Sequence, residues 1–489
     1  MRRLVFTLGL VCLFAHALHA LELPNVLSSN MVFQQGKPVP VWGTAAAGTT
    51  VEVVFGDQVK RVVADASGSW MATLDAMKAS FDARDLTIRS EDGDTVLSNI
   101  LIGEVWLCGG QSNMEYPMRR QQKRYAAPAR GQDVAELELE RGGNPHIRLL
   151  RIHKKRSLPD CTTDGWAVMS DTALASFSAA GYYFGKYLQE SLQVPVGLIS
   201  SNWGGSRIEP WTAASAYRNS PVFAAEAQAN PLTIDGSSVG ENYNSMIAPL
   251  APYALKGFIW YQGESNAMIH DARYVEKTAL MLEDWRTIFN APKAPFYFVQ
   301  IAPYLYTRRS KDAKQHTPQT LPEFGALQTQ CLELDYTGQV IVTDLVDRLT
   351  DIHPSYKWEV GRRLALQALA QTYGVKKEFS GPVLKSVRVK KNEVRLSFRH
   401  LGRGLTAGMH READNAFIAT NDTLSWFEVA GADAVFYPAK AVVDGKKVVL
   451  SSPNVVEPMH VRFAWNERAC PTFFNKEGLP AVPFQVSRR

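Results

Sequence analysis

Residues 104–114 read Glu-Val-Trp-Leu-Cys-Gly-Gly-Gln-Ser-Asn-Met, an apolar run that passes through two glycines into a polar motif. The stretch 104–108 has the length and the near-continuous hydrophobicity of a strand covered on both faces. Two glycines followed by polar residues predict a tight turn where that strand ends. The same order of strand and polar turn recurs along the chain, and this recurrence is typical of an α/β fold with a largely parallel sheet.

The recurrence extends from about residue 101 to residue 374. Further buried strands are expected at 194–200, 257–261, 296–301 and 340–343. Two helices are expected between or after them, one at 273–289 and one following Pro354. Each helix has one apolar stripe that would pack on the sheet. In the first helix the stripe is Val275, Ala279, Leu282, Trp285 and Phe289, and in the second it is Val360, Leu364 and Ala368.

The segments on either side of this region have a different character. Arg2 and Arg3 precede an apolar stretch at 4–15 and small residues up to Ala20, which predicts a secretory signal at 1–20 and a periplasmic or secreted protein. Short β-type runs separated by turns then predict a β-sandwich-like module at 21–100. The α/β domain is expected at 101–378, and a second β-rich module at 379–489.

Composition excludes several classes of protein. The chain has 489 residues, of which 46% are hydrophobic and 21% charged, so it is neither disordered nor fibrous. The net charge of +5 is spread out, and no basic run is longer than 154–156, so a nucleic-acid partner is not expected. No stretch is long and apolar enough to span a membrane. Oligomeric state and disulfide pairing are left open.

Four polar motifs each follow an expected strand, at 109–114, 201–206, 262–266 and 350–354. Ligands of open α/β sheets bind where parallel strands end, so these motifs are expected at one edge. Together they supply a hydroxyl, glycine amides, carboxylates and an imidazole, the groups that acyl transfer needs. Each motif alone also fits a structural role: Ser112 and Gly204-Gly205 in turns, Gln262 and Glu264 at a helix N-terminus, and His353 before Pro354 at a helix entrance.

In combination the motifs resemble those of bacterial sialate O-acetylesterases, within the SGNH (GDSL-like) hydrolase superfamily. The resemblance spans almost the whole chain after residue 20 and implies a flavodoxin-like α/β/α domain flanked by β-rich modules. Gln111 stands where the wider superfamily has Asp, Gln262-Gly-Glu264 replaces an Asn-containing block, and Asp351 lies two residues before His353 rather than three. The acetylesterase branch resembles this sequence in all three respects.

The resemblance implies a role for each site residue. Ser112 would be the nucleophile and His353 its base, with Asp351 or Glu264 orienting the imidazole. The oxyanion would be held by the backbone amides of Ser112 and Gly205 and by the Gln262 side chain. Substrate contacts are expected from Asn113, Asn202 and Arg207. Arg207 would either face the carboxylate of a sialic acid or pair with Glu209.

The expected substrate is an O-acetylated sialic acid, and no cofactor or metal is expected. An acetyl xylan or other plant-polysaccharide acetylesterase would use the same catalytic groups. A metal-dependent deacetylase would need His and Asp ligands at chelating spacing, and the sequence offers only the pair Asp351 and His353. A non-catalytic glycan-binding protein is the remaining alternative, against which the intact Ser112 and His353 argue.

Overall fold

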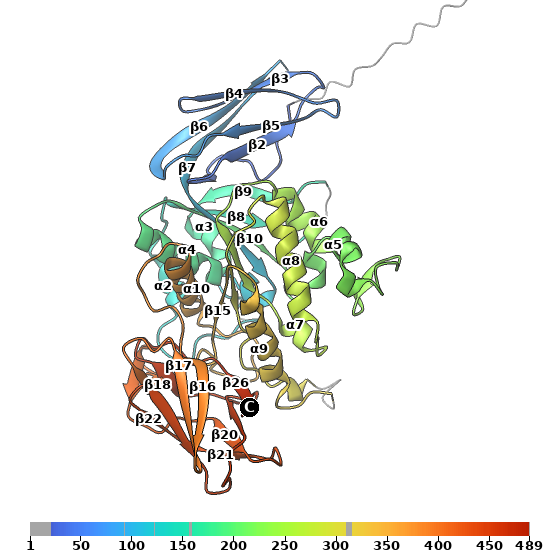
Figure 1. Cartoon of the computed structure of the whole chain (residues 1–489). Coiled ribbons are helices and arrows are strands. Elements are labelled where there is room, and N and C mark those ends of the chain that lie inside the picture. The colour runs from blue at the N-terminus through green and yellow to red at the C-terminus, as the bar shows by residue number, and fades with distance from the viewer. Residues whose placement is uncertain (1–20, 92, 122, 156–158, 310–314, 489) are drawn as a thin grey trace, which may run out of the picture.

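The computed structural model describes residues 21–91, 93–121, 123–155, 159–309 and 315–488. Three parts follow one another from end to end: an N-terminal β module, a central α/β domain and a C-terminal β module (Figure 1). The expected secretory signal at 1–20 lies outside the described residues. Within the described residues, no helix is both long and apolar enough to cross a bilayer.

The central domain is built on a parallel sheet. Its strand order is β15-β14-β13-β7-β10-β8-β9, and every neighbouring pair is parallel except β8 and β9 at one edge. This order starts in the middle and grows to both sides, as in doubly wound folds. The strands are β7 (Gly93–Gly110), β8 (Ile147–Ile152), β9 (Thr163–Val168), β10 (Val196–Asn202), β13 (Gly257–Tyr261), β14 (Phe296–Val299) and β15 (Thr337–Val340).

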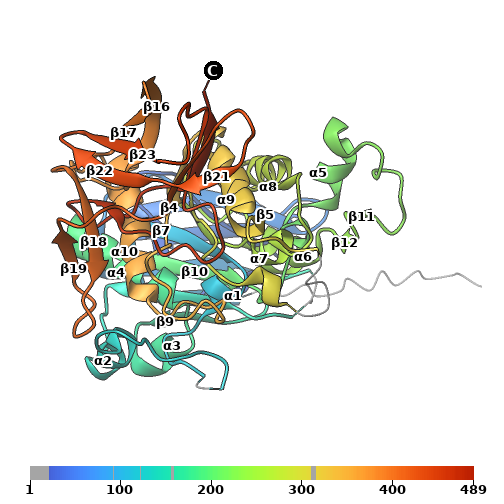
Figure 2. The same cartoon turned by 90° about the horizontal axis from the view of Figure 1, so that it is seen from below.

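Helices cover both faces of this sheet (Figures 1 and 2). On one face α4 (Ala179–Leu192) and α10 (Lys357–Gln371) pack on each other and on strand residues such as Trp106. On the other, α8 (Tyr274–Ile288) and α9 (Thr320–Gln330) pack on residues such as Trp260. Shorter helices lie in the connections: α1 (Ser112–Glu115), α2 (Val134–Glu140), α3 (Asp171–Ala175), α5 (Ala214–Asn219), α6 (Glu241–Met246) and α7 (Glu264–Ala267).

Strand β7 joins the N-terminal module to the central sheet. Its first half pairs with β6 (Ser80–Ser90) and β1 (Val32–Gln34), and its second half pairs with β10 and β13. The expected boundary at residue 100 therefore falls inside a strand that both parts share. The remaining strands of the module are β2 (Val39–Thr44), β3 (Thr50–Phe55), β4 (Gln58–Val63) and β5 (Ser69–Leu74).

The C-terminal module is made of antiparallel sheets around a core that includes Leu396, Val448 and Phe463. It is bound to the α/β domain by polar contacts, among them His410 Nε2 to Asp344 Oδ2 at 2.7 Å and the Glu467 carboxylate accepting from Thr307. Its strands are β16 (Val383–Lys390), β17 (Glu393–Arg399), β18 (Leu405–His410), β19 (Phe417–Thr420), β20 (Phe427–Ala430), β21 (Phe436–Pro438), β22 (Lys440–Asp444), β23 (Lys447–Ser451), β24 (His460–Phe463), β25 (Phe473–Asn475) and β26 (Phe484–Ser487). They form three sheets, with the strand orders β16-β17-β23-β22, β19-β18-β25 and β21-β20-β24-β26.

Several elements are shifted from their expected positions. The strand expected at 340–343 is β15 at 337–340, because its ladder with β14 ends where Val340 faces Val299. The strand expected at 194–200 continues to Asn202. The buried face of α8 is centred on Tyr274, Met281 and Trp285 rather than on Val275 and Ala279, which are half-buried.

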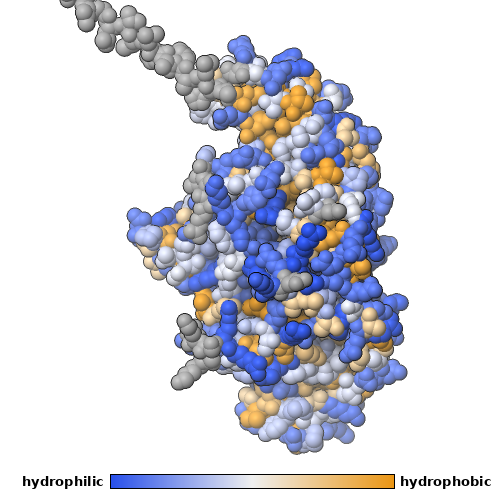
Figure 3. Space-filling model, turned by 180° about the vertical axis from the view of Figure 1, so that it is seen from behind, coloured by the Kyte–Doolittle hydropathy of each residue, from blue (hydrophilic) through white to orange (hydrophobic). Residues whose placement is uncertain are grey.

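The surface carries no single dominant hydrophobic face in the view from behind. Figure 3 shows hydrophobic patches on the N-terminal module, and a mainly hydrophilic surface over the middle of the molecule. The four cysteines of the described residues are free thiols, with Cys108, Cys161 and Cys331 buried and Cys470 exposed.

Candidate active site

Three of the four motifs begin at the same level of the sheet. Gly110 at the end of β7 lies in register with Asn202 on β10 and with Tyr261 on β13. The turns that follow these residues therefore meet at one edge, as expected for parallel strands. The fourth motif reaches this edge from the connection between β15 and α10.

Ser112 is placed by a sharp change of direction after β7. Gly110 has a φ of +140°, and a side-chain carbon there would collide with the Tyr261 carbonyl. Gln111 is the N-cap of α1, and Ser112 is its first helical residue, 7% exposed. A glycine at position 110 thus lets the chain turn within one residue and presents the serine hydroxyl at the sheet edge.

The Ser112 hydroxyl is hydrogen-bonded to His353. Ser112 Oγ and His353 Nε2 are 2.9 Å apart. Burial lowers the pKa of His353 to about 4, and the positive charges of Lys357, Arg124 and Arg309 act in the same direction. The imidazole is therefore neutral at neutral pH, the state in which it can accept a proton from the serine.

Asp351 is the carboxylate beside this histidine. Its Oδ1 accepts a hydrogen bond from the His353 backbone amide at 2.9 Å and lies 3.7 Å from His353 Nδ1. The second distance is too long for a hydrogen bond, but catalytic contacts are often loose when no substrate is bound. Of the two acids expected to orient the imidazole, the geometry favours Asp351.

Glu264 lies further from the imidazole, in a buried polar cluster below it. Glu264 accepts a hydrogen bond from Asn113 Nδ2, which also donates to the Ile352 carbonyl at 3.0 Å. Lys357 Nζ donates at 2.7 Å to both Asn113 Oδ1 and the Pro354 carbonyl. Burial raises the pKa of Glu264 and lowers the pKa of Lys357 to about 7. The cluster holds the backbone on both sides of His353.

This cluster corrects the expectation for Asn113. Its side chain is fully buried, and both its amide nitrogen and its oxygen are occupied by Glu264, Ile352 and Lys357. A group enclosed in this way positions the loop of His353 and does not reach a substrate. Asn202 fits its expected place better, because together with Ser200 it lines a cavity that Glu115 and Tyr125 also line.

Two backbone amides of the site motifs are without an acceptor among the described residues. Over the part of the chain that the structure describes, neither the Ser112 nor the Gly205 amide has a hydrogen-bond partner. Gly205 has a φ of +79°, and the preceding Gly204 amide donates to Glu115 Oε2 at 2.5 Å. Glu115, a residue not singled out from the sequence, thus holds the loop that carries the Gly205 amide.

The Gln262 side chain is fully buried and engaged elsewhere. Its Nε2 donates to Asn266 Oδ1 at 2.7 Å and to the Ser206 carbonyl at 3.2 Å, and its Oε1 accepts from the Tyr274 hydroxyl at 2.9 Å. Both donor hydrogens of the amide are occupied in this arrangement. The oxyanion role of Gln262 stays a prediction, and it requires the amide to leave one of these acceptors.

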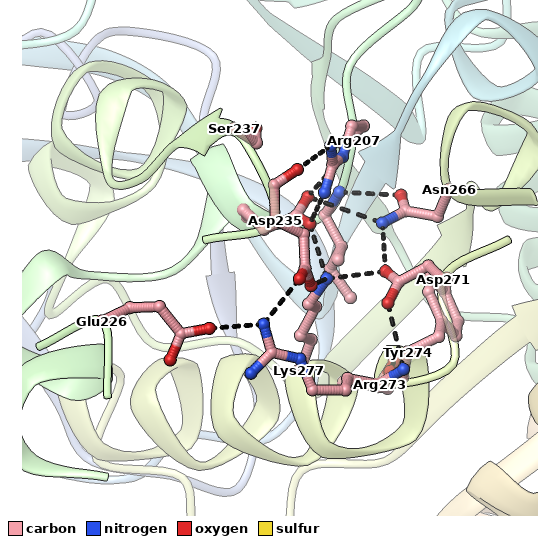
Figure 4. A network of polar contacts seen from close by, with 12 residues as sticks. Arg207, Glu226, Asp235, Ser237, Asn266, Asp271, Arg273, Tyr274 and Lys277 are labelled. Atoms are coloured by element: carbon pink, nitrogen blue, oxygen red, sulfur yellow. Dashed lines mark hydrogen bonds and ion pairs between the residues drawn. The ribbon is translucent and has the colours of Figure 1, made fainter. Parts of the chain in front are cut away.

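Arg207 belongs to a buried network of charges behind the loop (Figure 4). It binds the Glu209 carboxylate and donates to the Asp235 carbonyl at 2.9 Å. Lys277 Nζ lies 2.7 Å from Glu209 and 2.8 Å from Asp271. Because Glu209 is fully buried, its charge needs these cations. The pairing with Glu209, the alternative expected for Arg207, is the one observed, and it occupies the guanidinium that a contact with substrate would need.

A cavity of about 470 Å³ opens next to the serine and the histidine. Tyr125 connects them, since it lines the cavity and its ring meets the His353 ring edge-on at 5.2 Å. Ser112 and His353 themselves are not part of its walls. Most charged groups in the walls are basic: Arg119, Arg120, Arg124, Arg151 and Lys154.

A basic stretch of the sequence corresponds to part of the wall of this cavity. Residues 119–124 read Arg-Arg-Gln-Gln-Lys-Arg, a dense basic stretch shortly after the serine motif. Among the described residues, no group of three His, Cys, Asp or Glu side chains is arranged to hold a metal ion.

A doubly wound α/β sheet with a serine and a neutral histidine in contact at its carboxyl edge has the arrangement of a serine hydrolase. The chain belongs to the carbohydrate esterase family of sialic acid-specific acetylesterases, whose family model matches residues 102–365.

Known proteins resemble the chain over nearly its whole length. The sialate O-acetylesterase of Mus musculus is 27% identical over 92% of this chain and 91% of its own length. The Homo sapiens sialate O-acetylesterase is 27% identical over 94% of this chain and 91% of its own. A carbohydrate acetylesterase from Xanthomonas citri has a solved structure that matches with a TM-score of 0.81 and 31% identity, covering 96% of this chain and 100% of that one.

Proposed function

We propose that this esterase removes O-acetyl groups from sialic acids by way of an acetyl-serine intermediate on Ser112. The observation that carries the proposal is the 2.9 Å contact between Ser112 Oγ and the neutral His353, next to a cavity large enough for a monosaccharide. The family of the chain and the names of its mammalian relatives support the choice of substrate.

In the first half of the reaction, Ser112 Oγ attacks the acetyl carbonyl carbon while His353 Nε2 takes the hydroxyl proton. The carbonyl oxygen then carries the negative charge and accepts hydrogen bonds from the amides of Ser112 and Gly205, which have no other acceptor among the described residues. Collapse of this intermediate breaks the bond between the carbonyl carbon and the sugar oxygen. His353 returns its proton to that oxygen, and the deacetylated sugar leaves.

In the second half, water repeats the attack on the acetyl-enzyme. His353 takes a proton from the water, and the Ser112 oxygen leaves with that proton as acetate is released. Asp351 orients the imidazole and stabilises its charged form. Each of these steps uses only water and groups of this chain, so we expect no cofactor.

The decisive experiment measures acetate released from 9-O-acetylated sialic acid, with p-nitrophenyl acetate as a general substrate. We expect both to be hydrolysed, with no effect of EDTA. A rate that EDTA abolishes and Zn²⁺ restores would contradict the serine mechanism. Hydrolysis of p-nitrophenyl acetate alone would leave the esterase mechanism standing and exclude the sugar.

A neutral-glycan acetylesterase is the second candidate, because the matching Xanthomonas citri structure is described only as a carbohydrate acetylesterase. Acetylated xylo-oligosaccharides test it directly. A higher kcat/KM on these neutral sugars than on O-acetylated sialic acid would move the assignment to a plant-polysaccharide acetylesterase. A chain without measurable hydrolysis of any ester would instead be a glycan-binding protein.

We further propose that the protein is made by a bacterium, because it is 31% identical to the Xanthomonas citri enzyme and 27% identical to the mouse and human ones, and that it is exported, as the signal-like residues 1–20 indicate. Export would bring the enzyme to sugars outside the cytoplasm. Fractionation of expressing cells checks this: the esterase activity should be recovered from the periplasm or medium, and should move to the cytoplasm when residues 2–20 are deleted.

A further inference from the structure

The cavity beside Ser112 has an excess of positive charge. Five Lys or Arg side chains line it, against a single carboxylate, that of Glu115. Two of the five are neutralised, because Arg120 pairs with Asp133 and Lys154 Nζ lies 2.7 Å from Glu115 Oε1.

The other three cations are Arg119, Arg124 and Arg151. Judged on the described segments of the chain, none of the three has a carboxylate within 4 Å. Arg124 lies over the Tyr125 ring, 5.1 Å from its centroid, and Arg151 Nη2 lies 3.3 Å from His153 Nδ1. Guanidinium groups that line one cavity repel each other, and a bound anion relieves that repulsion.

Two of these arginines are placed differently relative to the nucleophile. A side-chain carbon on Gly204 would lie 3.0 Å from Arg124 Nη2 and 3.3 Å from Ser112 Cβ, so Arg124 stands close to the reacting serine. Arg151 lies on β8, in register with Ser200 on β10, and β10 lies between β8 and β7. Two strand spacings, roughly 10 Å, therefore lie between the Arg151 backbone and β7.

We propose that Arg124 and Arg151 bind the carboxylate of an acidic sugar while its acetyl ester lies at Ser112; this inference rests on the proposed function. A sialic acid carries its carboxylate at carbon 1 and the ester at carbon 9, so the carboxylate lies away from the nucleophile. Arg151 supplies a cation displaced from Ser112, and Arg124 supplies one nearer to it. Arginine is suited to the task, because its planar fork binds a carboxylate through two hydrogen bonds.

The test compares 9-O-acetylated sialic acid with its carboxyl methyl ester, which has the same shape around the acetyl group but no charge. Acetate release gives kcat/KM for each, and the ratio of the two cancels any effect on the catalytic step itself. We expect wild type to prefer the free acid. In Arg124→Gln/Arg151→Gln that preference should fall by about tenfold to a hundredfold, the usual cost of losing hydrogen bonds to a charged group.

The matched control is Lys123→Gln/Lys155→Gln. It removes the same amount of charge from positions one and four residues away in the chain, but neither lysine lines the cavity. We expect it to keep the wild-type ratio at 0.15 M salt, about physiological ionic strength. An equal fall in both double variants would mean that general attraction of anions explains the preference, and the subsite would be rejected.

The remaining outcomes separate this proposal from the proposed function. Equal kcat/KM of wild type on the acid and its methyl ester would overturn the subsite and leave the sialate esterase standing. Hydrolysis of p-nitrophenyl acetate without release of acetate from either sugar would overturn both.

Discussion

Ser112 Oγ and His353 Nε2 are 2.9 Å apart although 241 positions separate the two residues in the chain. The contact exists because β7 and the connection before α10 end at the same edge of the sheet. Ser112 is held by a turn that only glycine permits at position 110, and His353 by the buried cluster of Asn113, Glu264 and Lys357.

Replacing the nucleophile should abolish the reaction. Ser112→Ala is expected to lower kcat on p-nitrophenyl acetate by about 10⁶, as loss of a serine nucleophile does elsewhere. The melting temperature should stay within a few degrees of wild type, because His353 is the only hydrogen-bond partner of the hydroxyl among the described residues. A folded variant that keeps a tenth of the activity would show that another residue is the nucleophile.

The two acids near the histidine should contribute unequally. Asp351→Asn should lower kcat by up to about 10⁴ through loss of the charge that orients the imidazole. Glu264→Gln should cost much less, because glutamine keeps an oxygen that can accept from Asn113. Steady-state kinetics on both variants decides the matter, and the reverse order would make Glu264 the orienting acid.

Acidic pH should inactivate the enzyme only near pH 4. Protonated His353 cannot accept the serine proton, so kcat/KM falls as pH drops through its pKa, which burial and nearby cations lower to about 4. The measurement is a pH profile of acetate release, with circular dichroism to establish that the protein stays folded. An acid limb near 6.5, the ordinary pKa of histidine, would contradict the buried, cation-flanked environment.

Gly204 should not tolerate a side chain. In Gly204→Ala the new carbon would lie 2.8 Å from Glu115 Oε2 and 3.3 Å from Ser112 Cβ, which displaces the carboxylate that holds the loop of the Gly205 amide. A loss of one oxyanion donor lowers kcat by about 10²–10³. Gly431→Ala is the control, because the nearest atom to its new carbon is at 3.6 Å. Comparable activity of the two variants would remove the Gly205 amide from the proposed mechanism.

Arg207 should matter for stability and not for substrate choice. Arg207→Ala removes hydrogen bonds to the buried Glu209, which keeps Lys277 as a partner, so we expect a cost of about 1–3 kcal/mol in the free energy of unfolding. Arg388→Ala, at an exposed position of β16, should cost less than about 0.5 kcal/mol. Urea denaturation measures both. A changed preference between 9-O-acetylated sialic acid and its carboxyl methyl ester in Arg207→Ala would show that this arginine contacts the substrate.

Sequence patterns located the edge of the sheet well because they depend on local order. The strand at 257–261 and the motif after β7 follow from an apolar run and a glycine turn, and these features survive any packing around them. Strand ends were less certain. β15 ends three residues earlier than expected because its partner strand ends there, although Val342 is also buried.

The orientation of polar side chains was beyond the sequence. Ser112 and Asn113 are neighbours in one motif, yet the Ser112 side chain contacts His353 in the site and the Asn113 side chain is buried against Lys357. Lys277 would be assigned to the exposed face of α8 by its polarity, but it is fully buried with Glu209 and Asp271. Such placements are set by partners distant in the chain, and neither periodicity nor motif spacing specifies them.

The position of β7 in two sheets has a consequence for the way the molecule unfolds. Its eighteen residues begin among the antiparallel strands of the N-terminal module and end two residues before the nucleophile. Fraying of the pairing with β6 would loosen the same backbone that fixes Ser112. The N-terminal module and the catalytic sheet should therefore melt as one cooperative unit, and an enzyme shortened at residue 100 would lose the anchored end of its central strand, not an independent appendage.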